Sequence, residues 1–285
     1  MEVLLIKIGF ALLSASVVLS FAYLFSRNEN FSLWMWYVLG VGIAAHAAAF
    51  VVRVEAFWAI AENRYYFPIN SFFGALCYLG WAMMVIFWLV EGKHRLHVLG
   101  AFVLPWAWIS IGAGLRYADP SVSGLVPALQ SYWINIHPVI LMTSYAAFAN
   151  AFGVGLALLI QERQIKSRRP SALCYRLPAI EELDNLNYRI ISFAFPVLTV
   201  GIFMGGVWAY NAWGRFWGWD AKETWALVTW LIYVVYLHMR LFAGWRGRKT
   251  VYVSMAGFAA VVFTFYGVNF LSELHGYLSG GGGIR

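Results

Sequence analysis

The sequence contains little charge, and this scarcity limits the kind of protein it can encode. Only 12% of its 285 residues are Asp, Glu, Lys or Arg, whereas soluble domains contain about 25%. With 62% hydrophobic residues, the chain has too few polar side chains to cover a folded surface in water. This composition excludes an ordinary soluble protein, a disordered chain, a coiled coil and a collagen.

The sequence also lacks the alternating segments of about ten residues that build a membrane β-barrel. Its apolar runs are instead about twenty residues long and unbroken. Because backbone groups in lipid must be hydrogen-bonded internally, we predict an all-α, polytopic membrane bundle that forms a single domain over residues 1–285. We expect about eight transmembrane helices, over residues 3–25, 33–58, 70–90, 96–113, 134–160, 190–210, 224–242 and 250–271.

Cysteine is scarce as well. The two cysteines, Cys77 and Cys174, are far apart and no CxxC motif occurs, which excludes a disulfide framework and an internal thiol–disulfide site. The first nineteen residues lack the basic start and the small-residue cleavage site of a signal peptide. We therefore expect them to remain as the first transmembrane helix.

Basic residues are distributed unequally between the two sets of loops. Thirteen Lys and Arg residues fall in or beside one set, and six fall on the other side. The basic set comprises residues 26–32, 91–95, 161–189 and 239–250. The positive-inside rule places this set in the cytoplasm and both termini outside. The basic loops also account for the net charge of +7, so this charge does not indicate a nucleic-acid partner. Residues 161–189 are predicted to form a cytoplasmic amphipathic connector.

Tryptophan is abundant, and one segment holds a third of it. Five of the fifteen Trp residues lie in the outward segment 208–225, whereas an interfacial belt needs one or two at each helix end. Gly214 and Gly218 interleave with them and allow close approach of a flat partner, and indole rings stack on such partners. The segment is interpreted either as an outward platform for a planar ligand such as haem or as an enriched aromatic belt. The five residues are Trp208, Trp213, Trp217, Trp219 and Trp225.

Asp220 ends this segment and permits two readings. It precedes an apolar run and stands three residues before Glu223, which is the spacing of a capping box. It is therefore expected to cap a helix, to contact a ligand, or to do both.

Four histidines are placed where they can bind a ligand. His46 and His238 lie in apolar runs at similar estimated depths, and a polar side chain there is costly and indicates function. His137 and His275 both lie at the outward boundary, at the level of the tryptophans. Neutral imidazole is a common axial ligand of haem iron. Zinc fits less well, because the chain has no HExxH motif and no cysteine cluster.

Arg53 follows His46 by seven residues and lies on nearly the same helix face. Three roles are open for it: pairing with a haem propionate, pairing with Glu55, or extending toward the membrane surface.

Three segments resemble a known family. The stretch WGRFWGWDAKETWALVTWLIYVVYLHMR is similar to the WWD signature of the haem-handling proteins of cytochrome c biogenesis, in their CcsA (ResC-type) branch of System II. The segments SYWINIHPVILMTSYAAFANAFG and NFLSELHGYL extend the resemblance around His137 and His275. It departs from the family at Gly74, where an acidic residue is common.

The resemblance implies a site. His137 and His275 would ligate haem on the outside, beside the catalytic residues Trp213, Trp217, Trp219 and Asp220. His46 and His238 would form a second, intramembrane pair that holds haem in transit. Gly214, Gly218, Trp225 and Arg53 would complete the cofactor-binding set, and the cofactor would be haem b, iron-protoporphyrin IX.

The resemblance also implies an activity, that of a cytochrome c synthase. The protein would move haem outward and attach it by thioether bonds to the CxxCH motif of apocytochrome c. A ResB-type (CcsB) membrane partner and an outward thiol reductant would assist it. The expected location is the plasma membrane of a prokaryote, in preference to a thylakoid membrane.

Two other functions remain open. One is a CcmC-like haem exporter or handler that does not itself attach haem. The other is a membrane cytochrome that carries electrons on haem groups ligated by two histidines.

Overall fold

The computed structural model describes residues 1–26, 28–94, 96–168 and 170–270. Eight α-helices and no strands occur in this part of the chain, which confirms the predicted all-α fold. The helices are α1 (Glu2–Ser26), α2 (Glu29–Trp58), α3 (Phe72–His94), α4 (Gly100–Tyr117), α5 (Trp133–Lys166), α6 (Ile180–Trp213), α7 (Ala221–Leu241) and α8 (Arg248–Phe265).

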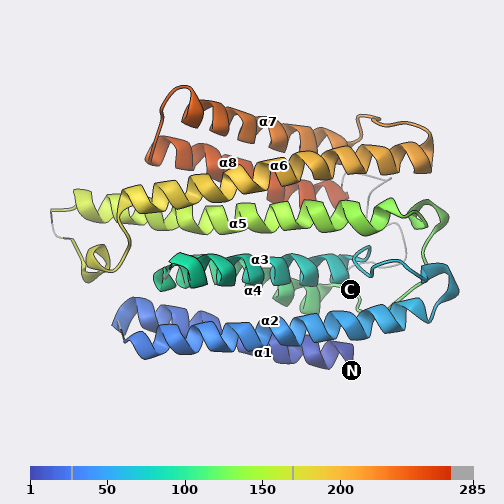
Figure 1. Ribbon diagram of the computed structural model, residues 1–285, viewed down its shortest axis with the longest axis horizontal. Coiled ribbons are helices and arrows are strands. Elements are labelled where there is room, and N and C mark those ends of the chain that lie inside the picture. The colour runs from blue at the N-terminus through green and yellow to red at the C-terminus, as the bar shows by residue number, and fades with distance from the viewer. Residues whose placement is uncertain (27, 95, 169, 271–285) are drawn as a thin grey trace.

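Consecutive helices pack as hairpins, and the hairpins stack in chain order. Helix α1 packs on α2, α3 on α4, α5 on α6 and α7 on α8. Figure 1 shows the α1–α2 hairpin along one edge of the bundle and the α7–α8 hairpin along the opposite edge. Helix α5 connects these halves, since it contacts α3, α4, α6 and α8. It also buries the most residues of any helix, including Phe148, Ala149 and Leu158.

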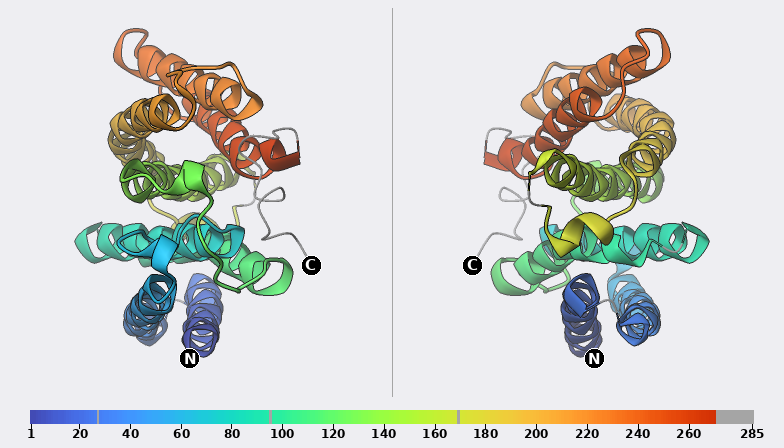
Figure 2. Two further views of the ribbon diagram at one scale, coloured as in Figure 1. Left: turned by 90° about the vertical axis from the view of Figure 1, so that its right-hand side faces the viewer. Right: turned by 90° about the vertical axis from the view of Figure 1, so that its left-hand side faces the viewer.

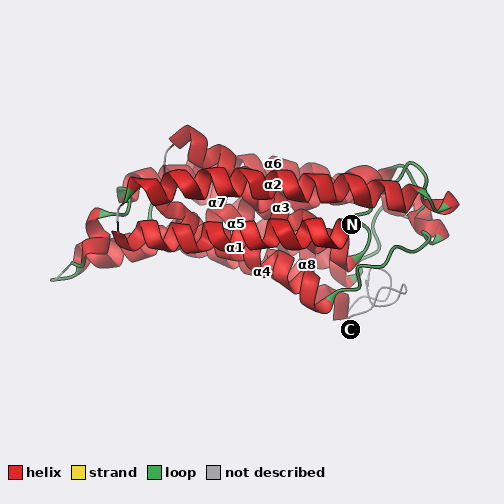
Figure 3. Cartoon of the chain, turned by 90° about the horizontal axis from the view of Figure 1, so that it is seen from below, coloured by secondary structure: helices red, strands yellow, loops and turns green. Residues whose placement is uncertain are grey.

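The two ends of the bundle differ in chemistry. The α2–α3, α4–α5 and α6–α7 connections gather at one end, together with the N-terminus (Figures 1 and 2). The connections that follow α1, α3, α5 and α7 lie at the other end (Figure 3), and they carry most of the basic loop residues. By the positive-inside rule the first end is predicted to face outward, and we call it the outer end.

Seven of the described helices, α1 to α7, are long and apolar enough to cross a membrane. Helix α8 is not among them, because its 18 residues begin with the charged pair Arg248 and Lys249. The protein is therefore a multi-pass membrane protein: about eight transmembrane helices were predicted, and seven of the eight helices in the described residues are able to span a membrane.

Helices α5 and α6 extend into the predicted connector 161–189, most of which is helical. Helices α5 and α6 have 34 residues each, about 51 Å at 1.5 Å per residue, so both project beyond a hydrocarbon core of about 30 Å. Only residues 167–179 lie between them. This segment is held in place, because Gln161 donates to the Cys174 carbonyl and Arg176 donates to the Leu24 carbonyl at the end of α1.

Buried polar side chains join the helices at defined points. Asn187 of α6 donates to the Ala151 carbonyl of α5 at 2.7 Å and accepts from the Tyr236 hydroxyl of α7 at 3.1 Å. Nearer the basic end, Arg240 of α7 forms a buried ion pair with Asp184 of α6. The second Asp184 oxygen accepts from the Gly247 N–H at 2.8 Å, so this carboxylate also fixes the α7–α8 turn.

Replacing Arg240 with Ala should destabilise the protein by about 3 kcal/mol, because the Asp184 charge would remain buried without its cation. Unfolding of the purified protein in a denaturing detergent measures this change. Arg246→Ala is the control, since Arg246 is exposed in the same turn. Equal stabilities of the two variants would contradict the structural role of the ion pair.

Candidate functional site

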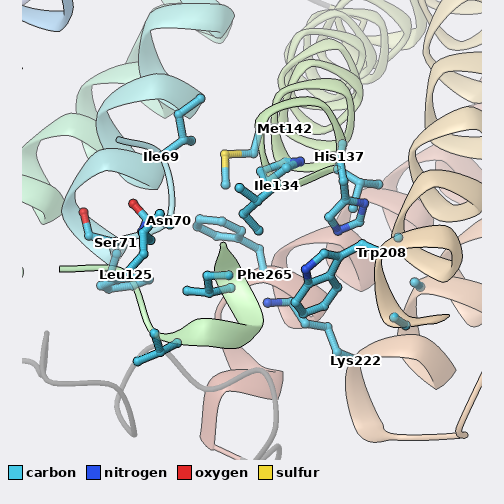
Figure 4. Close-up of a pocket in the computed structure, with 18 of the residues that line it drawn as sticks. Ile69, Asn70, Ser71, Leu125, Ile134, His137, Met142, Trp208, Lys222 and Phe265 are labelled. Carbon is cyan, nitrogen blue, oxygen red and sulfur yellow. The ribbon is translucent and has the colours of Figure 1, made fainter. Parts of the chain in front are cut away.

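The outer end holds a cavity of about 410 Å³, within the usual range for small-molecule sites. Its wall is built by residues from six helices, α2, α3, α5, α6, α7 and α8, and from the connections at the outer end. Figure 4 shows two sides to it: His137, Trp208 and Lys222 lie on one side, and Asn70, Ser71 and Leu125 lie on the other. We call these the aromatic side and the polar side.

The glycines of α6 leave the space that the His137 ring occupies on the aromatic side of the cavity. A Cβ atom at Gly205 would lie 2.6 Å from the His137 ring, so only glycine allows the ring to lie there. Nδ1 of His137 is 2.9 Å from the Gly201 carbonyl oxygen. Because a carbonyl oxygen can only accept, Nδ1 carries the proton and Nε2 of the neutral ring keeps its lone pair. This is the arrangement that orients a metal-binding histidine.

The five tryptophans of 208–225 separate into three groups. Trp208, Trp213 and Trp217 line the cavity, and the Trp208 ring stacks parallel to His137 with ring centres 6.4 Å apart. Trp219 is 68% exposed, and Trp225 packs on Phe263 of α8 instead. The indole nitrogen of Trp217 is buried and has no hydrogen-bond partner in the described part of the chain.

The predicted platform loop is shorter than 208–225, because α6 continues to Trp213 and α7 begins at Ala221. Gly214 ends α6 with φ of +72°, a conformation that glycine adopts without strain. The Arg215 side chain occupies the space that a Cβ at Gly218 would need. Trp219 has φ of +59°, which is unusual for a bulky residue and requires firm support from its surroundings.

That support comes from the capping box of α7. Asp220 accepts from the Glu223 N–H at 2.7 Å, and Glu223 accepts in return from the Asp220 N–H at 3.3 Å. Glu223 also accepts from the Gly218 N–H at 2.6 Å. The capping role predicted for Asp220 is confirmed, and one carboxylate joins the loop to the helix.

Arg53 lies in the wall of the polar side, but its guanidinium is already engaged. It donates to Glu2 at 2.6 Å, to the Pro120 carbonyl at 3.1 Å and to Ser71 at 3.2 Å. The sequence left open a pairing of Arg53 with Glu55. In the structure Arg53 instead forms an ion pair with Glu2 of α1. Arg53 is 3% exposed, so it ties the outer ends of α1, α2 and α3 to the α4–α5 connection.

Two further residues shape the polar side. Asn63 is fully buried; it donates to the Ser123 carbonyl at 2.9 Å and accepts from the Leu125 N–H at 2.8 Å, which pins the α4–α5 connection against the α2–α3 connection. At Gly74 a Cβ would overlap the Pro68 carbonyl. The first turn of α3 therefore leaves no room for a larger side chain at this position.

The structure does not bring all the predicted ligands together. His46 packs against Gly9 of α1, and its Nδ1 lies 3.0 Å from the Gly42 carbonyl oxygen. His238 lies exposed on α7, stacked on Phe242. These helices occupy opposite edges of the bundle (Figures 1 and 2), so His46 and His238 do not form one site within this chain. His275 lies outside the described residues.

Sequence reasoning missed several residues of the cavity. Phe216 lies flat on Gly206, and Lys222 extends from α7 into the cavity (Figure 4). The segments 69–72 and 119–126 form the polar side. Lys222 was detectable in principle, because it is a lysine within the motif WGWDAKETW. The two polar segments carry no such signal.

Comparison with known proteins gives consistent results. Residues 69–275 match the family described as "Cytochrome C assembly protein". The chain is 36% identical over 235 residues to the cytochrome c biogenesis protein CcsA of Guillardia theta, covering 74% of this chain and 77% of the relative. It is 34% identical over 289 residues to the CcsA protein of Gloeothece citriformis, covering 85% and 88%.

A solved structure shares the fold. The cytochrome c haem lyase CcmF superposes with a TM-score of 0.73 at 16% identity. The superposition covers 96% of this chain but only 46% of CcmF, so this chain corresponds to less than half of that larger protein.

If His137 ligates haem, Gly205→Ala should displace its ring and weaken that ligation, since the new methyl group would occupy the ring's position. We expect haem retention to fall by about tenfold, the lower part of the range for residues that orient a metal ligand. The Soret absorbance per purified protein measures it. Gly92→Ala is the control, because a Cβ there meets only Trp36 at 3.6 Å, and an equal loss in this control would contradict the proposed seating.

Substitutions of Asp220 distinguish its two expected roles. Asn is also a good helix cap, so Asp220→Asn should retain stability, whereas Asp220→Ala should lose about 1 kcal/mol. Thermal unfolding in detergent and haem retention are measured together. A loss of haem in Asp220→Asn at full stability would show that the charge contacts the ligand.

Proposed function

We propose that the chain is the haem-attaching subunit of a cytochrome c synthase. The chain belongs to the cytochrome c assembly protein family and acts in cytochrome c maturation, and the proposal builds on this membership. The chain would hold haem b in the cavity at the outer end and join it to the CxxCH motif of apocytochrome c. The observation that carries this proposal is His137, which the Gly201 carbonyl orients in a cavity lined by three tryptophans.

The residues present fit a haem. An imidazole held by a backbone carbonyl suits an axial ligand, and flat indole faces suit a porphyrin. We propose His275 as the second axial ligand, and the family match extends to this residue. Trp213 and Trp217 would contact the porphyrin, while Gly214, Gly218, Trp219, Asp220 and Trp225 would fix the shape and end of the loop.

The chemistry asks little of the protein besides positioning. In thioether formation, a cysteine S–H adds across a haem vinyl C=C bond: sulfur bonds to one carbon and the hydrogen ends on the other. No external oxidant or nucleophile is consumed. The contribution of the chain is to hold haem and thiol at reacting distance, with the polar side of the cavity available to the peptide. Reduced cysteines would be supplied by a separate outward thiol reductant, since the chain has no CxxC motif.

The route that we propose for haem to this site differs from the intramembrane histidine pair that the resemblance implied. Since His46 and His238 lie at opposite edges of the bundle, we propose His238 as a single ligand on the surface of α7. Its second ligand would come from outside this chain, as a ResB-type membrane partner would allow. His46 would act separately, between α1 and α2.

Of the alternatives, an electron-carrying cytochrome is the less favoured. That function needs two facing histidines inside one bundle, and the described residues offer no such pair. A CcmC-like handler remains the alternative to be tested, because it would use the same cavity without attaching haem.

Coexpression of the chain with a ResB-type partner and an apocytochrome c tests the proposal. His137→Ala should reduce covalently bound haem in the cytochrome by at least about tenfold, since loss of an axial ligand should cost no less than loss of a residue that orients one. Covalent haem is the fraction that resists extraction with acidified acetone.

His97→Ala is the matched control, because His97 lies near the basic end, paired with Glu91. Wild-type protein that binds haem but yields no covalent product would favour the handler. Unchanged attachment in His137→Ala would contradict the site.

A further inference from the structure

We propose that residues 121–126 of the α4–α5 connection bind the polypeptide chain that flanks the CxxCH motif of apocytochrome c, by pairing with its main chain. The segment would act as an edge to which an extended peptide adds as a strand. This inference rests on the proposed function, because it takes apocytochrome c to be the substrate of the cavity. It assigns that partner a binding surface on the polar side.

The segment 121–126 lines the cavity along its whole length. Figure 4 shows Leu125 of this segment on the side opposite His137. The segment contains no turn or bend, and none of its residues has a positive φ. Side chains of an extended chain alternate between two faces. Consecutive residues can therefore all line one cavity only if main-chain atoms form part of its wall.

Buried polar side chains hold one edge of the segment. Asn63, which is fully buried, donates to the Ser123 carbonyl at 2.9 Å and accepts from the Leu125 N–H at 2.8 Å. A residue of a neighbouring parallel strand would bond to residues 123 and 125 in the same way. Just before the segment, Arg53 donates to the Pro120 carbonyl at 3.1 Å. The segment is thus fixed before a peptide arrives, which lowers the entropy cost of binding.

The opposite edge of the segment carries unpaired main-chain groups. In an extended chain, the N–H and C=O groups of successive residues point to alternate edges. Because residues 123 and 125 bond to Asn63, Val122 and Gly124 direct their groups the other way. Neither the N–H nor the C=O of these two residues has a hydrogen-bond partner in the described part of the chain. An extended peptide would supply both donors and acceptors to them.

The chemistry of the substrate favours recognition through its main chain. The CxxCH motif specifies two cysteines and a histidine, and the proposed reaction uses these side chains at the haem. The flanking residues are not specified, so their main chain is what all substrates share. The first and fourth residues of an extended peptide point to opposite faces. The motif itself must therefore turn for both thiols to reach one haem, and the flanking chain is the part that pairs with residues 121–126.

The test uses a fluorescent peptide in which the motif, with serine in place of both cysteines, lies between flanking residues and cannot form thioethers. A second peptide has the same sequence, but its flanking amide nitrogens are methylated and cannot donate. Fluorescence anisotropy measures the binding of both to the purified, haem-loaded, full-length protein in detergent. The methylated peptide should bind about tenfold more weakly, because main-chain hydrogen bonds are lost.

Three substitutions locate the contact on the protein. Gly124→Pro removes an N–H from the unpaired edge. It should weaken binding of the unmethylated peptide about fivefold, the effect of losing one hydrogen bond, and leave binding of the methylated peptide unchanged. Gly124→Ala keeps the N–H, and its Cβ would lie 3.8 Å from the Glu62 carboxylate, so binding should not change. Ser123→Pro removes an N–H from the edge that faces Asn63 and should not change binding either.

Three results would overturn the inference: no binding of the unmethylated peptide, equal binding of the two peptides to the wild-type protein, or equal weakening of both in Gly124→Pro. Loss of Soret absorbance in a folded Gly124→Pro protein would also overturn it, because the N–H would then serve the haem. If Gly124→Pro does not fold, as judged by circular dichroism, the two peptides on the wild-type protein decide. Failure of the synthase proposal looks different, because the peptides would then bind with this discrimination while no covalent cytochrome formed.

Discussion

The close approach of α5 to α6 is the constraint on which the outer site depends. Gly201 and Gly205 remove the side chains that would keep the helices apart, as small residues do in many membrane helix pairs. In the space gained, the His137 ring lies against α6 and donates its Nδ1 proton to a backbone carbonyl. The same contact therefore packs two helices, selects the tautomer and orients Nε2.

The loop after α6 is rigid for a related reason, since its backbone is bound by side chains at both ends. Gly214 closes α6 in the left-handed conformation, and Glu223 of α7 holds the N–H groups of Gly218 and Asp220. A loop so fixed can tolerate the positive φ of Trp219. Tryptophans on such a loop form a preorganised wall, which loses little entropy when a planar ligand binds.

The stacking of four hairpins explains why the cavity needs nearly the whole chain. The aromatic side comes from α5, α6 and α7, whereas the polar side comes from the connections around α3 and α4, braced by Arg53 and Asn63. The same stacking places the α1–α2 and α7–α8 hairpins at opposite edges. His46 lies in the middle of α2 and His238 in the last turn of α7, so the two histidines are separated laterally and also differ in their position along the bundle.

The sequence by itself determined the membrane class, the approximate number of helices and the capping box at Asp220, and it predicted an orientation. These follow from local properties: the length of apolar runs, the placement of Lys and Arg, and the three-residue spacing of a helix cap. Only the tertiary structure decided that Arg53 pairs with Glu2 and that three of five clustered tryptophans line the cavity. It alone separated His46 from His238 and placed Lys222 in the wall of the same cavity as His137. The physical reason is that periodicity fixes depth and helix face, whereas the neighbours of a side chain depend on how glycines and buried polar groups let the helices meet.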